Sequence, residues 1–302
     1  MKSGDPDRYN QASLLKPIAM SSSHIPSAAA LDHSPLGQAS LYVDQYDKSL
    51  LFPIARSLNR DLLSSDTARP RNGVDIWTAY ELSWLNTRGK PQVATATFSI
   101  PANTPHLIES KSFKLYLNSF NQTRYADADA LAAVMTKDLS QAAGAAINVT
   151  IHAPSSFENV SVRELQGIDL DAQDIDIDAY LPDANLLALD ATGKSCSEVL
   201  VSRLLKSNCP VTGQPDWGSI QISYSGRALD RAQLLRYIVS FRQHAGFHEH
   251  CVETIFDDIM RVCAPTSLTV YARYTRRGGL DINPWRSSTS DAAPTNVRTA
   301  RQ

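Results

Sequence analysis

The sequence of 302 residues lacks the features that mark several specialised classes of protein. Its 29 Lys and Arg residues are matched by 31 Asp and Glu residues, so it has no basic excess of the kind that binds a nucleic-acid backbone. No run approaches the roughly 18 consecutive apolar residues of a membrane span, and the N-terminus has no apolar core of signal-peptide length. We therefore expect a cytoplasmic protein that binds neither nucleic acid nor a membrane.

Cysteines and glycine motifs are equally sparse. The four cysteines, Cys196, Cys209, Cys251 and Cys263, are too few for a disulfide framework in a chain of this length, so we expect reduced thiols. No G-x-G-x-x-G pattern follows a predicted strand, and no G-x-x-x-x-G-K-[ST] loop is present. A Rossmann domain and a P-loop are therefore unsupported. A nucleotide cofactor would be held by basic side chains in a cleft between domains or subunits.

The length and composition predict about two domains with a sizeable core, since 43% of the residues are hydrophobic. Residues 1–36 and 287–302 are rich in small and polar residues without a sustained period, which predicts a mobile leader and a mobile tail. Between them we expect an N-terminal module over residues 37–165, an acidic connector over 166–190 and a C-terminal module over 191–286. The connector lacks the glycine and the final glutamate of a calcium loop, so we interpret it as a solvated linker.

Hydrophobic periodicity predicts a similar plan in both halves. In the first half, alternation predicts strands over residues 92–100, 111–117 and 146–152, and helical spacing predicts a helix over 127–143. In the second half, the pattern predicts a strand over 219–224, a helix over 229–244, a second helix after Gly246 and a closing strand over 268–274. This order indicates a duplicated α+β unit.

Cys209 and Asp216 are candidates for catalysis. Cys209 lies in a loop with Pro and Gly residues just before a predicted strand, and Asp216 follows at the start of that strand. Functional thiols are often positioned in such loops by a rigid scaffold, and a carboxyl group beside Trp217 could be kept protonated as a general acid. The pair could supply a nucleophile and a proton, although the spacing alone leaves a structural role open.

The sequence His248-Glu249-His250-Cys251 places two imidazoles, a carboxylate and a thiol at the start of a predicted helix. The two histidines with Cys251 or Cys209 could provide three zinc ligands and leave an open position for water. The same residues could instead contact a substrate, or Glu249 could simply favour the helix N-terminus through the dipole. These alternatives remain open from the residues alone.

Two further segments carry charge close to backbone turns. Glu109 precedes Lys111 and Lys114, which is typical of a charged strand edge but also suits a carboxylate that accepts two N–H donors and lysines that contact phosphate. Arg277 and Gly278 follow the predicted closing strand and suit either a phosphate contact or a solvated turn.

Together these motifs resemble the NADPH-dependent 7-cyano-7-deazaguanine reductases, the nitrile reductases of queuosine biosynthesis, in their long two-module form. The resemblance covers nearly the whole folded body. It rests on the Glu-Ser-Lys-Ser-Phe-Lys-Leu-Tyr signature at residues 109–116, the Cys209 loop, Phe-His-Glu-His-Cys at 247–251, Arg-Gly-Gly at 277–279 and Asn-Pro-Trp at 283–285. It implies tandem tunnelling-fold modules, which are antiparallel sheets with helices on one face.

The resemblance also implies a reaction and a set of residue roles. The nitrile of 7-cyano-7-deazaguanine would be reduced by two NADPH to the primary amine, in a homodimer and without a metal. Cys209 would form a covalent thioimide and Asp216 would donate a proton. Matching motifs place the deazaguanine on Ile108, Glu109, Ser110, His248 and Glu249, and place NADPH on Ser110, Lys111, Arg277 and Gly278.

Two other functions remain as alternatives. A zinc-dependent hydrolase resembling GTP cyclohydrolase I would use the two histidines and the cysteines as metal ligands. A purine- or pterin-binding module would bind the deazaguanine and consume no NADPH.

Overall fold

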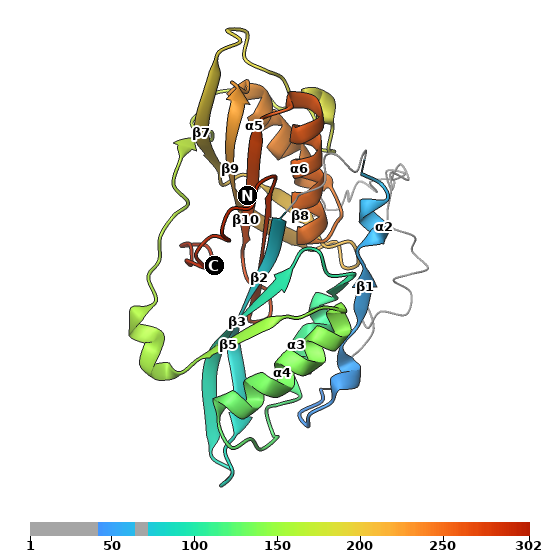
Figure 1. The fold of residues 1–302 in the computed structure, drawn as a ribbon, viewed down its shortest axis with the longest axis vertical. Coiled ribbons are helices and arrows are strands. Elements are labelled where there is room, and N and C mark those ends of the chain that lie inside the picture. Colours follow the sequence, from blue (N-terminus) through green and yellow to red (C-terminus); the bar gives the residue numbers. More distant parts are fainter. Residues whose placement is uncertain (1–41, 64–71) are drawn as a thin grey trace, which may run out of the picture.

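The computed structural model describes residues 42–63 and 72–302, so the predicted leader over residues 1–36 lies outside the described part. Its framework is one large sheet that runs through both halves of the chain (Figure 1). Across the sheet the strands follow the order β5 (Asn148–His152), β3 (Pro91–Pro101), β2 (Asn72–Leu85), β11 (Leu280–Ser287), β10 (Ser267–Tyr274), β9 (Pro215–Arg227), β7 (Ser195–Ser202) and β6 (Ile168–Asp169), and β8 (Lys206–Asn208) also pairs with β9. Adjacent strands are antiparallel except for β6 and β7.

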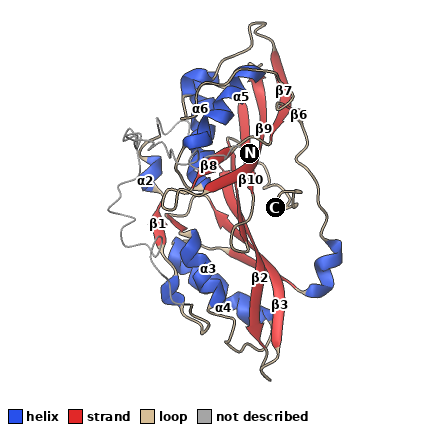
Figure 2. Ribbon diagram, turned by 180° about the vertical axis from the view of Figure 1, so that it is seen from behind, coloured by secondary structure: helices blue, strands red, loops and turns tan. Residues whose placement is uncertain are grey.

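Helices cover one face of this sheet (Figures 1 and 2). The longer ones are α3 (Ser110–Asn118), α4 (Ala128–Ala143), α5 (Arg231–Ser240) and α6 (His248–Cys263). The short α2 (Ser57–Arg60) follows β1 (Pro53–Ala55), which pairs with β4 (His106–Ile108), and 3-10 turns occur at η1 (Lys48–Leu50), η3 (Pro154–Asn159), η4 (Ala184–Leu186) and η5 (Phe241–Gln243). Within the described ranges, no helix has both the length and the apolar character to cross a membrane. The α+β class with antiparallel strands is confirmed.

Two hydrophobic cores lie between the sheet and the helices. In β3 every second residue from position 94 to position 100 is buried, as expected for a strand with one covered face. These residues pack with Leu131, Met135 and Leu139, which the 3.6-residue period places on one side of α4. Burying each of these side chains contributes roughly 1.5–3 kcal/mol. A second core forms where α5 and α6 cover β7, β9 and β10.

Strand β11 joins the two halves. It pairs with β2 along its whole length, from Leu280 to Ser287, but with β10 only where Thr269–Tyr271 meets Trp285–Ser287. Toward the loop at residues 275–279 the two strands separate, so the sheet opens there. Residues from both halves of the chain meet on the helix-covered side of this opening.

The segment 111–117, predicted as a strand, is part of helix α3. Phe113, Leu115 and Leu117 do alternate with polar residues, but the buried apolar residues are Phe113, Tyr116 and Leu117, which have helical spacing. Glu109 decides between the two patterns, because its carboxylate caps the first turn by accepting hydrogen bonds from the backbone N–H groups of Lys111 and Ser112. The strand prediction was therefore wrong, and the signature lies at a helix N-terminus.

The C-terminal end also differs from the sequence prediction. The strand at residues 268–274 does not close the fold, because β11 follows it. Residues 287–302, predicted to stand apart from the folded body, pack against it: the Gln302 side chain accepts a hydrogen bond from Arg273 Nε at 2.9 Å and donates one to Asn283 Oδ1 at 2.7 Å. This contact depends on polar groups, so no hydrophobic period reveals it. The other predicted strands and helices are present.

Candidate active site

One cavity is lined by both halves of the chain. Its lining residues are Trp77, Leu107, Ile108, Glu109 and Ser110 from the first half, and Cys209, Pro210, Asp216, Gly246, Phe247, His248, Glu249, Arg277 and Ile282 from the second. Every predicted site residue is among them except Lys111 and Gly278, which are the next residues after Ser110 and Arg277. The first residues of α3 and α6 also line the cavity, so two helix N-termini border it and their dipoles favour electron-rich groups there.

A hairpin positions Cys209 and Asp216. Strands β8 and β9 pair so that Ser207 lies opposite Asp216. The connecting loop is closed by hydrogen bonds from Cys209 N to Gln214 O at 2.8 Å and from Gly213 N to Cys209 O at 3.0 Å. Gly213 has a φ of 66°, a left-handed conformation that glycine adopts readily. Cys209 is 9% exposed and Asp216 is 5% exposed, so both candidate catalytic groups are sheltered from bulk water.

Asp216 contacts two other predicted site residues. Arg277 Nη2 lies 2.8 Å from Asp216 Oδ1, an ion pair that lacks the angle of a hydrogen bond, and His248 Nε2 lies 3.5 Å from Asp216 Oδ2. Trp217 does not wall off the carboxyl group, because successive strand residues point to opposite faces and Trp217 is 38% exposed. The side chains that contact the Asp216 carboxyl group are instead the basic ones of Arg277 and His248.

The two histidines of the predicted zinc motif enter different surroundings. Residues at i and i+2 of a helix point roughly 200° apart. His248 stacks on Tyr274 with ring centroids 3.9 Å apart, whereas His250 contacts the edge of the Phe247 ring and has a pKa lowered to about 4 by burial. In the part of the chain that the structure describes, no group of three His, Cys, Asp or Glu side chains is arranged to hold a metal ion. The geometry gives no support to the zinc-dependent hydrolase.

Glu109 is fully buried and serves the helix as well as the cavity. Its Oε1 accepts a hydrogen bond from Lys111 N at 2.6 Å and its Oε2 accepts one from Ser112 N at 2.7 Å. Burial raises the pKa of Glu109, opposed by these two hydrogen bonds. Each carboxylate oxygen has a second lone pair, so the group can also accept an N–H donor from a ligand. A helix-capping role for this carboxylate was not predicted from the sequence.

Glu249 is the second buried carboxyl group of the cavity. It lies in the first turn of α6, is 2% exposed, and its Oε1 has no hydrogen-bond partner in the described structure. Burial and then the charge of Asp75 raise its pKa to about 7, although His248 and Arg56 act in the opposite direction. A buried acceptor without a partner costs free energy, which a ligand with N–H donors would recover.

A cationic edge lies where α3 meets the loop after β10. A Cβ atom at Gly278 would lie 3.3 Å from Lys114 Cδ, so the lysine packs directly against this loop. Burial and then the nearby charge of Arg277 lower the pKa of Lys114. The predicted cofactor residues Ser110 and Lys111 lie in the same first turn of α3. Two cations that repel each other at a helix N-terminus fit an anionic group such as a phosphate of NADPH.

Lys111 and Lys114 were both expected to suit a phosphate contact, but the family motifs assign only Lys111 to NADPH. In a strand Lys111 and Lys114 would point to opposite faces, whereas in a helix residues at i and i+3 share a face. The helix over Ser110–Asn118 therefore brings the two lysines to one edge. The cap that Glu109 forms on this helix becomes visible only in the folded chain.

Known proteins match both halves of the chain. A family model described as the N-terminal part of the nitrile reductase 7-cyano-7-deazaguanine reductase matches residues 42–151, and one described as QueF-like protein matches residues 215–293. The NADPH-dependent 7-cyano-7-deazaguanine reductase of Bordetella pertussis is 60% identical over 273 residues, covering 90% of this chain and 100% of that protein. The enzyme of the same name from Chromobacterium violaceum is 62% identical over 277 residues, covering 91% and 99%.

The chain belongs to the NADPH-dependent 7-cyano-7-deazaguanine reductase family. A further reductase of this name, from Burkholderia vietnamiensis, is 56% identical over 271 residues and covers 90% of this chain and 99% of its own length. The family resemblance drawn from the motifs is thus confirmed. The match to the first family model contains the signature at residues 109–116. The match to the second contains Asp216, His248 and Arg277, and Cys209 lies between the two matched segments.

Proposed function

We propose that this chain catalyses the NADPH-dependent reduction of the nitrile of 7-cyano-7-deazaguanine to 7-aminomethyl-7-deazaguanine, in queuosine biosynthesis. The observation that carries the proposal is the cavity in which Cys209, Asp216, Glu109 and Glu249 meet. Such a cavity offers a thiol, a proton donor and acceptors for a guanine-like edge at one place. The names of the similar reductases specify the same substrate and cofactor.

Cys209 starts the reaction by covalent catalysis. Its Sγ attacks the nitrile carbon, so an S–C bond forms, one C–N π bond breaks, and the thiol proton is transferred by way of Asp216 to the nitrile nitrogen. The resulting thioimide is easier to reduce than a nitrile, which divides one difficult step into easier ones. The closed loop that holds Cys209 presents the thiol to the same cavity as Asp216.

Asp216 and His248 move the protons that the reduction needs. NADPH supplies one hydride to each of the two reduction steps. In the first step the hydride adds to the thioimide carbon and the nitrogen takes a proton; the S–C bond then breaks and a proton passes from the nitrogen to sulfur, which leaves an imine and the free thiol of Cys209. In the second step the hydride adds to the imine carbon and the nitrogen takes a proton, which gives the amine. Asp216 delivers that proton to the nitrogen, and His248 Nε2, 3.5 Å from Asp216 Oδ2, is placed to replenish it.

The two glutamates bind the deazaguanine ring by accepting hydrogen bonds from its N–H groups. A guanine-like edge presents adjacent N–H donors, which a carboxylate accepts in a pair. Glu249 offers an oxygen without a partner, and Glu109 offers the lone pairs that its helix cap leaves unused. Ile108, Ser110 and His248 complete the contacts that the family motifs assign to the substrate.

The cationic edge would hold NADPH. Ser110, Lys111, Arg277 and Gly278 are the residues that the family motifs assign. We add Lys114, because its side chain packs against Gly278. Arg277 contacts Asp216 at 2.8 Å, so the same residue that would bind the cofactor adjoins the proton donor. Cofactor binding and proton transfer are thus adjacent in the site.

Tandem tunnelling-fold modules and a homodimer in the cytoplasm complete the proposal. The antiparallel sheet with helices on one face supports this architecture (Figures 1 and 2). Light scattering of the purified protein tests the assembly: twice the chain mass of 33.1 kDa supports a homodimer, and a single chain mass contradicts it.

The covalent step is tested by intact-protein mass spectrometry after incubation with 7-cyano-7-deazaguanine alone. The wild-type protein and the Cys263→Ala control should both gain the mass of the whole nitrile, whereas Cys209→Ala should gain none and reduce none. Cys263 is a suitable control because it lies at the end of α6 and lines the hydrophobic core. Normal turnover by Cys209→Ala would contradict the role of the thiol.

A further inference from the structure

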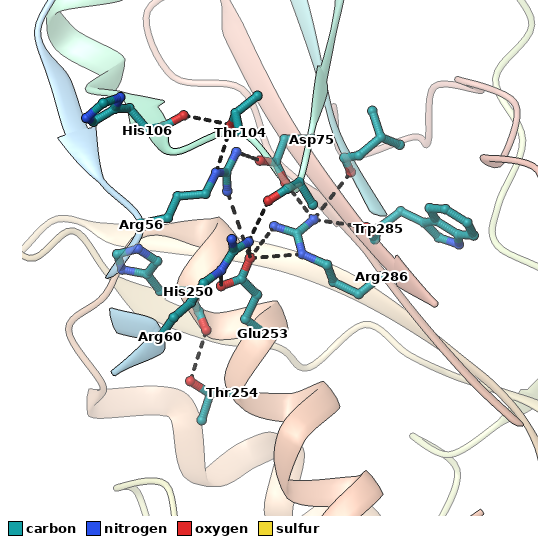
Figure 3. A network of polar contacts seen from close by, with 12 residues as sticks. Arg56, Arg60, Asp75, Thr104, His106, His250, Glu253, Thr254, Trp285 and Arg286 are labelled. Atoms are coloured by element: carbon teal, nitrogen blue, oxygen red, sulfur yellow. Dashed lines mark hydrogen bonds and ion pairs between the residues drawn. The ribbon is translucent and has the colours of Figure 1, made fainter. Parts of the chain in front are cut away.

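A buried network of charged side chains joins β2, α6 and β11 (Figure 3). Asp75 of β2 receives Arg56 Nη2 at 2.6 Å on one oxygen and Arg286 Nη1 at 2.7 Å on the other. Glu253 of α6 receives Arg286 Nη2 at 2.8 Å and Arg60 Nη2 at 2.6 Å. Asp75, Glu253, Arg56 and Arg286 are each at most 2% exposed, so their charges are shielded very little by water.

This network connects the two halves of the chain. Arg56, Arg60 and Asp75 precede β3, whereas Glu253 and Arg286 come from α6 and β11. The register of the sheet pairs Arg286 of β11 with Gly73 of β2, and the Arg286 side chain contacts Glu253 of α6. Since the substrate cavity is lined from both halves, a network that fixes α6 against β2 also fixes one wall of the cavity relative to the other.

Glu249 adjoins this network through two elements. On α6 it lies four residues before Glu253, which places both carboxyl groups on one face of the helix. On β2, Asp75 lies two residues before Trp77, so both point to the same face, and Trp77 lines the cavity together with Glu249. The network thus reaches the cavity wall that carries the unpartnered Glu249 oxygen.

The charges of the network are not balanced among themselves. Arg56, Arg60 and Arg286 contribute three positive charges, and Asp75 and Glu253 contribute two negative ones. Arg56 Nη1 is buried without a hydrogen-bond partner and lies 3.9 Å from Glu253 Oε1. Burial without full pairing is costly for both signs of charge. An ionised Glu249 is the additional negative charge that would balance the cluster.

We propose that the Arg56–Asp75–Arg286–Glu253 network is a positioning unit that fixes Glu249 in the substrate cavity and sets how readily its carboxylate accepts the N–H groups of the deazaguanine. The inference rests on the proposed function, because it assigns a basis to substrate recognition by Glu249. The four residues do not touch the cavity themselves and act through Glu249.

The charged groups around Glu249 predict the direction of each change. Asp75 on β2 disfavours the ionised form of Glu249, whereas Arg56 and the neighbouring His248 favour it. Glu253 and Arg286 hold these groups in place, and Glu109 and Asp216 line the same cavity. Removing the charge of Asp75 should therefore lower the pKa of Glu249, and removing the charge of Arg56 should raise it.

The test measures binding of 7-cyano-7-deazaguanine across the pH range in the Cys209→Ala protein, where no covalent adduct forms. Isothermal titration calorimetry should give a dissociation constant that rises about tenfold per pH unit below the pKa of Glu249, because the protonated carboxyl group accepts a donor pair poorly. Adding Asp75→Asn should move this midpoint to lower pH by about one unit, and adding Arg56→Met should move it to higher pH by a similar amount.

Two further variants separate charge from general damage. Arg56→Lys keeps the charge and loses the planar contacts, so its midpoint should stay near that of the parent protein. Asp138→Asn changes another buried carboxyl group, which accepts hydrogen bonds from Tyr46 Oη at 2.7 Å and Tyr116 Oη at 2.9 Å in the N-terminal core. It should lower the unfolding midpoint and leave the binding midpoint unchanged.

Opposite shifts in Asp75→Asn and Arg56→Met support the positioning unit, while equal midpoints or shifts in one direction overturn it. If either variant fails to fold, the Arg56→Lys protein still tests the proposal. Its positive charge is retained, so a pH midpoint of binding that differs from the parent's by about one unit would contradict the proposal. Absence of deazaguanine binding to the Cys209→Ala parent at every pH would instead count against the proposed function.

Discussion

Glu253 provides the clearest prediction about the stability of the fold. Its carboxylate is 1% exposed and lies between three guanidinium groups, with Arg60 at 2.6 Å, Arg286 at 2.8 Å and Arg56 at 3.9 Å. Burial by itself would raise the pKa of Glu253, but the charges of Arg286, Arg60 and Arg56 and the hydrogen bond from Arg60 lower it from 4.5 to about 2. The ionised form is thus favoured by the folded state.

The size of the effect follows from this pKa difference. A change from 4.5 to about 2 corresponds to about 2.5 units, which at 1.36 kcal/mol per unit is about 3 kcal/mol of stability at neutral pH. Removing one partner of a buried ion pair independently costs about 3–5 kcal/mol. Because the pKa is depressed on folding, this contribution is complete above about 4.5 and is lost as the pH falls toward about 2.

Urea unfolding of Glu253→Gln measures this contribution. We expect the free energy of unfolding at pH 7 to fall by about 3 kcal/mol, and we expect the difference from the wild-type protein to narrow as the pH is lowered through the range between about 4.5 and about 2. The exposed Glu158→Gln variant is the matched control and should change stability by less than about 0.5 kcal/mol. A loss below about 1 kcal/mol, or a difference independent of pH, would refute the reasoning.

Three further predictions concern the cavity. In steady-state kinetics, the KM for the nitrile should rise as the pH falls below about 7, because Glu249 then becomes protonated. Glu249→Gln should have a higher KM that depends less on pH, and a KM with the same pH dependence as in the wild-type protein would contradict this role. Glu109→Ala should lower the free energy of unfolding by about 1 kcal/mol through the lost helix cap, measured in urea, besides weakening substrate binding; full stability would argue against the cap. Gly279→Ala should destabilise the loop after β10 and raise the KM for NADPH, because φ is 70° there and a Cβ atom would lie 2.4 Å from Glu81 Cδ; wild-type stability and kinetics would contradict the strain.

The parts of the fold with one clear period could be predicted from the sequence. Residues 92–100 alternate and residues 127–143 repeat every three to four positions, and the structure has β3 and α4 there. Residues 111–117 satisfy both periods at once, so the local pattern could not decide between strand and helix. The deciding contact is the cap formed by Glu109, which becomes visible only when the backbone is folded.

The candidate site was predicted where motifs are contiguous and missed where it depends on distant segments. Cys209, Asp216 and the His248-Glu249 pair belong to short motifs, and the structure brings them to one cavity. Asp75 and Arg286 lie more than two hundred positions apart in the sequence, at 2.7 Å in the fold. Neither residue has a local pattern that distinguishes it from a surface charge, so their network could be found only from the structure.

The most direct measurement of the central claim follows nicotinamide absorbance while the purified protein consumes 7-cyano-7-deazaguanine in the presence of NADPH and a metal chelator. A reductase that works through Cys209 should oxidise two NADPH for each nitrile that disappears, and the Cys209→Ala variant should oxidise none. Nitrile binding without any NADPH oxidation by the wild-type protein would contradict the account and favour a binding module.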